Sequence, residues 1–368
     1  MRIAFRVDAS REIGSGHVMR CLALADTARR SGWRTSFLCR AFDGHLGAWI
    51  EAAGHELHWL RPPAAGSAPD SGPAHLAWLG TTPDDDARAT SAALGDSVEV
   101  LVVDHYAIDA GWETALRDHA RVVVAIDDIA DRLHACDVLI DQNFFENAAL
   151  RYRDLVPGST VQLLGPRYAL LRSEFTGLAP DRDGLDPRGV QRLLVMFGGA
   201  DTADLTGRTV DALIAIGFDR DVVVVAGPRY QPIEALQRKV AQLEHGELIR
   251  SPPRIAALMA SADGAIGAPG VSSYERAAAL LPTLAISCAA NQHPLGRSLE
   301  QVGVHRFAGD SASLSDADLG DALLRFVDDG PGLRRQVAAM QGFCDGNGTV
   351  RVMDALQQTV AHTAVPLH

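Results

Sequence analysis

The sequence lacks a run of basic residues, and its formal net charge is −12, so a nucleic-acid-binding surface is not expected. The five cysteines are scattered and include no C-x-x-C pair, which indicates reduced thiols rather than a disulfide framework or a zinc site. No apolar run is long enough to cross a bilayer, and the charged start MRIAFRVDAS lacks the apolar core of a signal peptide. These absences predict a cytoplasmic, soluble protein with no membrane partner. We expect a monomer or a weak oligomer.

What the sequence does contain is a repeated pattern of strand-length apolar runs followed by helical segments. Residues 2–8, 98–106 and 121–128 are continuous Val/Ile/Leu runs, which are typical of strands buried on both faces of a parallel sheet. Residues 16–32 predict a helix that Gly32 ends. Its apolar face consists of Val18, Cys21, Leu22, Ala25 and Ala28.

The pattern restarts after the polar segment DRDGLDPRG at 181–189, which predicts a linker. We therefore expect an α/β fold of two Rossmann-like, doubly wound domains at 1–180 and 190–345, facing a central cleft at the carboxyl ends of their strands. The helix expected at 346–368 could pack back across the domain junction. The Pro- and Gly-rich residues 61–73 predict a surface loop of unknown role in the cleft.

His17 lies between a glycine turn and the start of the first predicted helix, in IGSGHVMR. Gly14 and Gly16 let the backbone approach a ligand, and the helix start offers free N–H groups. The helix dipole disfavours a protonated imidazole there, and a neutral imidazole can serve as a general base. A histidine that only fills this position and hydrogen-bonds locally fits the spacing equally well.

Asp104, His105 and Tyr106 follow a predicted buried strand, at an edge that lines the cleft in such folds. Tyr106 could contact a substrate, although the pattern alone favours a turn residue that caps the next helix. A second acidic stretch could bind Mg²⁺, but such residues more often cap a helix, and no metal is expected. That stretch contains Asp127, Asp128, Asp131, His134 and Asp137.

The second half has two further glycine-containing turns before predicted helices. Gly198 and Gly199 open the backbone at a helix start, which suits a phosphate. Ser272 and Ser273 can cap the next such helix or contact a phosphate, and Glu275 in its first turn can accept bonds from two ribose hydroxyls or simply complement the dipole. The next predicted strand is followed by Asn291 and Gln292, and both are expected to face the cleft.

Seven segments together resemble one family in the same order, from about residue 2 to about 355. They are FRVDASREIGSGHVMRCLALA, VVDHYAID, IDDIADRLHACDVLIDQN, LLGPRYALLRSEF, MFGGAD, GVSSYERAAALLPT and AANQ. The family is the UDP-2,4-diacetamido-2,4,6-trideoxy-β-L-altropyranose hydrolases of pseudaminic acid biosynthesis, which are related to GT-B glycosyltransferases. The segment APGVSSYE, with a proline before the glycine, leaves the geometry of the phosphate loop open.

The resemblance implies that the second domain binds UDP, with Glu275 on the ribose, Ser272 and Ser273 near the diphosphate and Asn291 near the diphosphate or sugar. It implies that His17 activates water at the anomeric carbon and that Tyr106 orients that water or the sugar. Arg172 of YALLR also matches a position of the family, and no role is assigned to it.

UDP leaves as a stabilised anion, so one base suffices where ordinary glycosidases need two carboxyl groups. The expected activity is inverting hydrolysis of the UDP-sugar, with water as the acceptor and neither a metal nor a cofactor. A UDP-sugar glycosyltransferase for a surface polysaccharide is the alternative. The sequence has no amphipathic, basic or aromatic-rich surface segment that could form the acceptor groove of a transferase, which favours water as the acceptor. A non-catalytic nucleotide-sugar-binding protein is the third possibility, and the His17 loop counts against it.

Overall fold

The computed structural model forms two compact units. The first unit contains Met1–Ser173 and returns with Asn347–His368, and the second contains Glu174–Gly346. The chain therefore crosses between units at residue 173, and not within the predicted linker. The described residues are 1–61, 74–178, 180–199, 201–252, 254–289 and 292–363.

The predicted linker at 181–189 is part of the second unit. The buried guanidinium of Arg182 donates hydrogen bonds of 2.5–3.0 Å to three backbone carbonyls, and Leu185 belongs to the hydrophobic core. The linker prediction was wrong because a polar, Pro- and Gly-containing segment can be held by one long side chain that satisfies buried carbonyls. Those carbonyls belong to Met259, Ala262 and Ala279.

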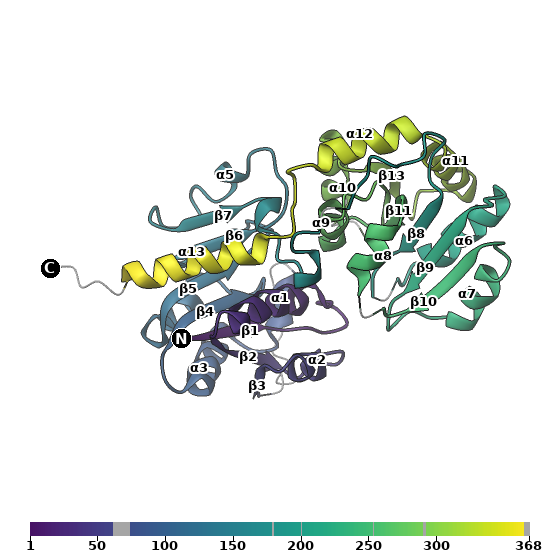
Figure 1. Ribbon diagram of the computed structural model, residues 1–368. Coiled ribbons are helices and arrows are strands. Elements are labelled where there is room, and N and C mark those ends of the chain that lie inside the picture. The colour runs from purple at the N-terminus through teal and green to yellow at the C-terminus, as the bar shows by residue number, and fades with distance from the viewer. Residues whose placement is uncertain (62–73, 179, 200, 253, 290–291, 364–368) are drawn as a thin grey trace. The chain divides into compact units, whose positions relative to one another are not determined.

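The first unit is built on a seven-stranded parallel sheet with the order β3-β2-β1-β4-β5-β6-β7 (Figure 1). The strands are β1 (Arg2–Val7), β2 (Arg34–Arg40), β3 (Glu56–Leu60), β4 (Val98–Asp104), β5 (Ala120–Ile126), β6 (Val138–Asp141) and β7 (Val161–Leu164). The helices are α1 (Gly16–Arg30), α2 (Gly47–Ala52), α3 (Pro83–Leu94), α4 (Ala110–Ala115), α5 (Ala148–Arg151) and α13 (Gly348–Thr363). Short 3-10 turns include η1 (Ala74–Leu79) and η3 (Pro166–Tyr168).

Both faces of this sheet are buried at the central strands β4 and β5, which explains why these strands are nearly continuous apolar runs. In β4, Val100 and Val102 pack in one core with α1 and α13, whereas Leu101 and Val103 pack in a second core with α3 and α4. Successive side chains of a strand point to opposite faces, so burial of both faces removes the usual alternation.

The C-terminal helix α13 packs on the first unit, next to α1 and β5 (yellow in Figure 1). Its buried stripe joins the core that also contains α1. The spacing of that stripe is the helical one that places side chains on a single face. It consists of Val352, Met353, Leu356 and Val360.

The second unit contains a six-stranded parallel sheet with the order β10-β9-β8-β11-β12-β13. The strands are β8 (Arg192–Met196), β9 (Asp221–Ala226), β10 (Gly246–Arg250), β11 (Gly264–Gly267), β12 (Thr283–Ser287) and β13 (Arg306–Asp310). The helices are α6 (Leu205–Ala215), α7 (Ile233–Val240), α8 (Ile255–Ser261), α9 (Val271–Ala278), α10 (His293–Gln301), α11 (Asp316–Val327) and α12 (Gly330–Met340).

In each sheet the chain first adds strands on one side of its first strand and then crosses over to add the later strands on the other side. In the first unit this switch point lies between β1 and β4, and in the second it lies between β8 and β11. Ligands of doubly wound folds bind outside the carboxyl ends of the strands at such a point. The loops after these four strands are therefore the places to look for a site.

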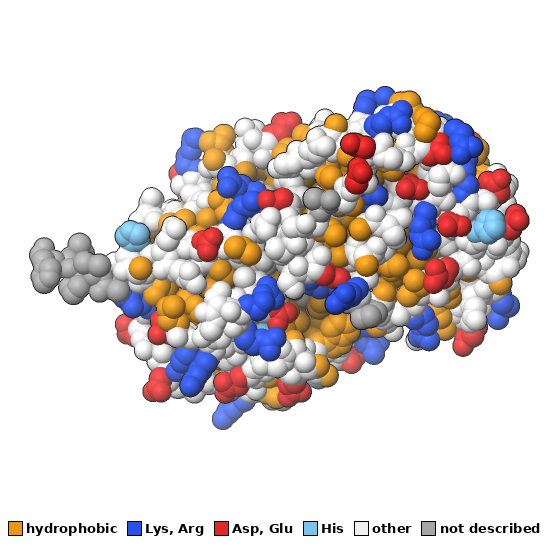
Figure 2. Space-filling view, in the orientation of Figure 1, with side chains coloured by type: hydrophobic (Ala, Val, Ile, Leu, Met, Phe, Trp, Pro, Cys, Tyr) orange, Lys and Arg blue, Asp and Glu red, His pale blue; other side chains and the backbone are white. Residues whose placement is uncertain are grey.

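Within the described ranges, no helix is both long and apolar enough to span a membrane. On the face drawn in Figure 2, acidic and basic side chains are interspersed.

Candidate active site

At the switch point of the first unit, a tight loop connects β1 to α1. Gly14 has φ +81°, a backbone conformation that favours glycine, and its N–H donates to the Ser10 carbonyl. The Ser10 hydroxyl accepts from the N–H groups of Glu12 and Ile13 at 3.0 Å. Among the described residues no side chain caps the start of α1, and a Cβ added at Gly16 would meet no atom within 4 Å. The loop therefore leaves the helix start accessible to a ligand.

His17 and Asp104 form a hydrogen-bonded pair at this point. Nδ1 of His17 lies 2.6 Å from Oδ1 of Asp104, the last residue of β4. Because an ionised carboxylate only accepts hydrogen bonds, this contact places the imidazole proton on Nδ1. In the neutral imidazole Nε2 then carries the lone pair, and it has no hydrogen-bond partner among the residues that the structure describes. An imidazole held in this tautomer can accept a proton from water.

The Asp104 carboxylate is buried and remains ionised. Burial alone would raise its pKa, but the charge of Arg20 and the hydrogen bonds from Arg20 and His17 hold that pKa well below the usual range. Arg20 donates from Nε to one carboxylate oxygen and from Nη2 to the other, both at 2.7 Å. The Cys21 thiol lies 3.5 Å from the same carboxylate. Asp104 is thus a fixed anion behind the His17 ring.

Tyr106 lies against the His17 ring, with centroids 4.7 Å apart and an edge-to-face angle of 79°. Its hydroxyl donates to Asp128, and burial and that carboxylate raise the pKa of the phenol well above its usual value. The interpretation of Tyr106 as a helix cap was wrong, because Asp109 caps α4 through the N–H groups of Gly111 and Trp112. The phenol instead belongs to a group of contacting side chains that we call the His17 cluster: His17, Arg20, Asp104, Tyr106 and Asp128.

The acidic stretch after β5 does not precede a helix, so its interpretation as a helix cap was also wrong. Asp128 accepts from Tyr106, and Asp127 accepts from the N–H of Ala130 at 2.9 Å and from Arg132 at 2.8 Å. In the part of the chain that the structure describes, no group of three or more His, Cys, Asp or Glu side chains is arranged to hold a metal ion.

Sequence reasoning missed Arg20, and it missed Asp104 and Asp128 as partners. His17 and Arg20 are three residues apart on α1, a spacing that puts both side chains on one helix face. That spacing was the available signal for Arg20. Asp104 and Asp128 lie 84 and 108 residues further along the chain than Arg20, so only the fold brings them together.

In the second unit, the expectation that Gly198 and Gly199 open a helix was wrong. The helix α6 begins at Leu205, and the carboxylates of Asp201 and Asp204 cap its first N–H groups at 2.7–3.1 Å. Those donors are therefore not available to a phosphate. The glycine pair forms a loop at the switch point instead, with φ +92° at Gly198.

At the start of α9, beside β11, the only side-chain contact to a backbone N–H among the described residues is that of the Ser273 hydroxyl with Gly270 at 3.3 Å, and Gly270 itself has no side chain to cap the helix. Behind it lies the buried Arg276, whose guanidinium donates to the carbonyl of Ala268 at 2.9 Å and to the hydroxyls of Ser272 and Ser273 at 3.2 and 3.1 Å. Burial lowers the pKa of Arg276 to about 10, and its Nε has no hydrogen-bond partner among the described residues. An uncapped helix start backed by a buried cation is a favourable place for an anion.

The remaining predicted site residues lie in different surroundings. Glu275 lies in the second turn of α9 rather than the first, because the helix starts at Val271. Gln292 precedes α10, and its side-chain carbonyl accepts from the N–H of Cys288 at 2.8 Å. Arg172 is half-buried between η3 and the end of the first unit. Asn291 and most of the loop at 61–73 lie outside the described residues.

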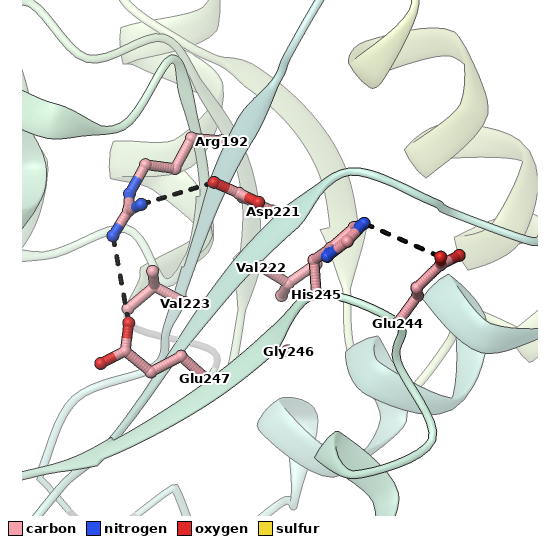
Figure 3. A pocket seen from close by; sticks show the side chains of 8 residues that line it. All are labelled: Arg192, Asp221, Val222, Val223, Glu244, His245, Gly246 and Glu247. Atoms are coloured by element: carbon pink, nitrogen blue, oxygen red, sulfur yellow. Dashed lines mark hydrogen bonds and ion pairs between the residues drawn. The ribbon is translucent and has the colours of Figure 1, made fainter.

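A separate hollow of about 280 Å³ lies at the opposite edge of the second sheet (Figure 3). The residues that line it lie at the amino ends of β8, β9 and β10. Arg192 points toward Asp221 and Glu247 there, at 3.5 and 4.0 Å, and His245 points toward Glu244. These charges pair with one another, so we place the candidate site at the switch points.

The fold is that of the GT-B glycosyltransferases, with two Rossmann-like α/β domains. The structure of UGT2 from Phytolacca americana, complexed with UDP-2-fluoro-glucose and pterostilbene, superposes with a TM-score of 0.69 at 15% identity and covers 98% of this chain and 99% of that one. No family model matches the sequence.

Two curated relatives are similar in sequence. One is the UDP-2,4-diacetamido-2,4,6-trideoxy-beta-L-altropyranose hydrolase of Campylobacter jejuni, 27% identical over 48% of this chain and 53% of its own length. The other is the spore coat polysaccharide biosynthesis protein SpsG of Bacillus subtilis, 26% identical over 56% of this chain and 61% of its own length. The matches thus span little more than half the length of these relatives.

Proposed function

We propose that this protein hydrolyses a UDP-sugar at the anomeric carbon and releases UDP and the free sugar. The observation that carries this proposal is the Asp104–His17 pair, 2.6 Å apart, which leaves Nε2 of His17 without a partner among the described residues. A buried carboxylate that fixes the imidazole tautomer is the arrangement that a general base requires.

In the proposed reaction, Nε2 of His17 takes a proton from water while the water oxygen bonds to the anomeric carbon. The bond from that carbon to the diphosphate oxygen breaks, and its electron pair leaves with UDP. Attack from the face opposite UDP inverts the anomeric centre. Tyr106, whose own proton is donated to Asp128, can accept a hydrogen bond from the water or the sugar through its oxygen.

We assign the nucleotide to the second unit. The uncapped start of α9 and the buried Arg276 support a diphosphate near Ser272, and Glu275 is assigned to the ribose. Ser273 is only 3% exposed and accepts from the N–H of Gly270 at 3.3 Å, so its part is to hold the loop. The other assigned ligand-binding positions are Gly14, Gly16, Arg172, Gly198, Gly199, Asn291 and Gln292.

UDP is a stable leaving group, so N–H donors and a buried cation can balance its charge without a protonating carboxylic acid. We therefore expect turnover to continue in the presence of EDTA. The name of the Campylobacter jejuni relative supports a diacetamido-trideoxy-altropyranose as the sugar. From the family resemblance we further propose a role in pseudaminic acid biosynthesis for flagellin glycosylation.

A glycosyltransferase is the second candidate function, because UGT2, which shares this fold, was solved with both a UDP-sugar analogue and pterostilbene. Phosphorus and proton NMR of the protein with the UDP-altropyranose derivative and EDTA separates the two. We expect UDP and free sugar without any added acceptor. UDP release only after an acceptor is added would show a transferase, and loss of activity in EDTA would contradict the metal-free reaction.

A further inference from the structure

Arg20 is the side chain that bonds to both carboxylates beside His17 and Tyr106, those of Asp104 and Asp128. Its guanidinium makes three hydrogen bonds of 2.7–2.9 Å to two carboxylates, through Nε and Nη2 to Asp104 and through Nη1 to Asp128. The side chain is 4% exposed. One buried cation therefore joins Asp104, at the end of β4, to Asp128, in the loop that follows the neighbouring strand β5.

Each of these carboxylates holds one of the two residues assigned to the reaction. Asp104 accepts from His17, and Asp128 accepts from Tyr106. The chain of contacts runs from His17 through Asp104, Arg20 and Asp128 to Tyr106 without a break. Buried networks of this kind fix the orientation of every member when all of their partners are present.

We propose that Arg20 is a positioning residue that holds His17 and Tyr106 in one fixed arrangement through Asp104 and Asp128. The inference rests on the proposed function of His17 and Tyr106. A planar guanidinium presents several N–H groups in a rigid fork, so it can bond both carboxylates at once. A lysine ammonium is a single point charge on a flexible stem and cannot reproduce that geometry.

The first test compares Arg20→Gln and Arg20→Lys with the wild type. Misplacing a catalytic group by about 1 Å can lower a rate about 10²-fold, so we expect kcat to fall by about that factor in both variants. KM and the Kd for UDP should stay unchanged, since the nucleotide is assigned to the second unit. The matched control is Arg29→Gln on the same helix, where the side chain of Arg29 is exposed and, among the described residues, bonds only to Asp26 at 3.2 Å. A kcat close to the wild-type value in both Arg20 variants would overturn the proposal.

A double-mutant cycle keeps the proposal falsifiable if the Arg20 variants fail to fold. Asp104→Asn and Asp128→Asn each break one side of the bridge, and Arg20 is the residue that bonds both. We expect the double variant to lose less kcat than the product of the two single losses, with a coupling of at least about threefold. Losses that simply multiply would show that the two sides act independently.

A measurement without substrate separates this inference from the proposed function. Nitrogen-15 NMR of the wild type should show His17 with its proton on Nδ1 and a lone pair on Nε2. In Arg20→Gln or Arg20→Lys, Asp104 loses two donors, and we expect a mixture of tautomers. An unchanged single tautomer would overturn the positioning role. Absence of UDP release by the wild type, with the tautomer shift present, would contradict only the proposed hydrolysis.

Discussion

Nδ1 of His17 lies 2.6 Å from Oδ1 of Asp104 and 3.3 Å from Nη2 of Arg20. The shorter contact identifies the carboxylate as the hydrogen-bond acceptor of the ring, because two N–H donors do not bond to each other. This relationship decides which nitrogen of the neutral His17 ring carries the lone pair.

Replacing Asp104 with asparagine should remove the fixed tautomer while leaving the size of the side chain unchanged. An amide can donate to Nδ1 and so place the imidazole proton on Nε2, the nitrogen that must accept a proton from water. We expect kcat to fall by about 10²–10⁴-fold, with UDP affinity unchanged. Steady-state kinetics and UDP titration calorimetry measure both values. Wild-type kcat in this variant would mean that the pair has no part in catalysis.

Replacing Gly227 with alanine should disturb the Gly198–Gly199 loop. A Cβ at residue 227 would lie 2.4 Å from the carbonyl oxygens of both glycines, so the loop must shift. We expect weaker UDP binding, by about 10-fold if one good contact is lost. Titration calorimetry measures the affinity, and Gly217→Ala is the control because a Cβ there meets no atom within 4 Å, although its positive φ strains the variant. Unchanged UDP affinity in Gly227→Ala would contradict the assignment of this loop to the nucleotide.

The first unit should lose stability as the pH rises from about 6.5 to 9. Burial lowers the pKa of His134, but its 2.8 Å hydrogen bond to Glu113 and the negative charges of Asp127, 3.8 Å away, and Glu113 outweigh burial and raise the pKa to about 9. A group whose pKa is raised on folding stabilises the fold below its unfolded value, and that stabilisation is lost as the pH passes the folded value. In His134→Gln this pH dependence should largely disappear.

Urea unfolding followed by tryptophan fluorescence measures this effect in the full-length chain. All five tryptophans belong to the first unit, so the signal reports that unit alone. The quantity to compare is the pH dependence of the free energy of unfolding in the wild type and in His134→Gln. Burial raises the pKa of Asp141 to about 7, so Asp141 adds a pH dependence of stability at lower pH that is the same in both proteins. An equal pH dependence in the two proteins would refute the role of His134.

The strands and the first helix were predictable because their signals are local. The run Val98–Asp104 contains apolar residues that pack on both faces of the sheet, and α1 starts at the predicted residue and ends two residues before Gly32. The position of His17 at the start of α1 was also readable, since it depends on the glycine turn beside it.

The contacts that make His17 a candidate base were not predictable from spacing. Asp104 is 87 residues away in the chain, and its side chain meets the imidazole only because β1 and β4 are neighbours in the sheet. The start of α6 was misplaced because two aspartates, Asp201 and Asp204, cap the helix six residues after the glycine pair. Side-chain capping of this kind overrides the simpler expectation that a helix follows directly after a glycine turn.

We propose that His17 directs a water molecule to the anomeric carbon. Hydrolysis of the UDP-sugar in water enriched with oxygen-18, analysed by mass spectrometry of both products, tests this role. We expect the label on the anomeric oxygen of the free sugar, none in UDP, and a rate about 10²–10⁴-fold lower in His17→Ala although UDP still binds. Label in UDP, or a His17→Ala variant that turns over at the wild-type rate, would contradict the account.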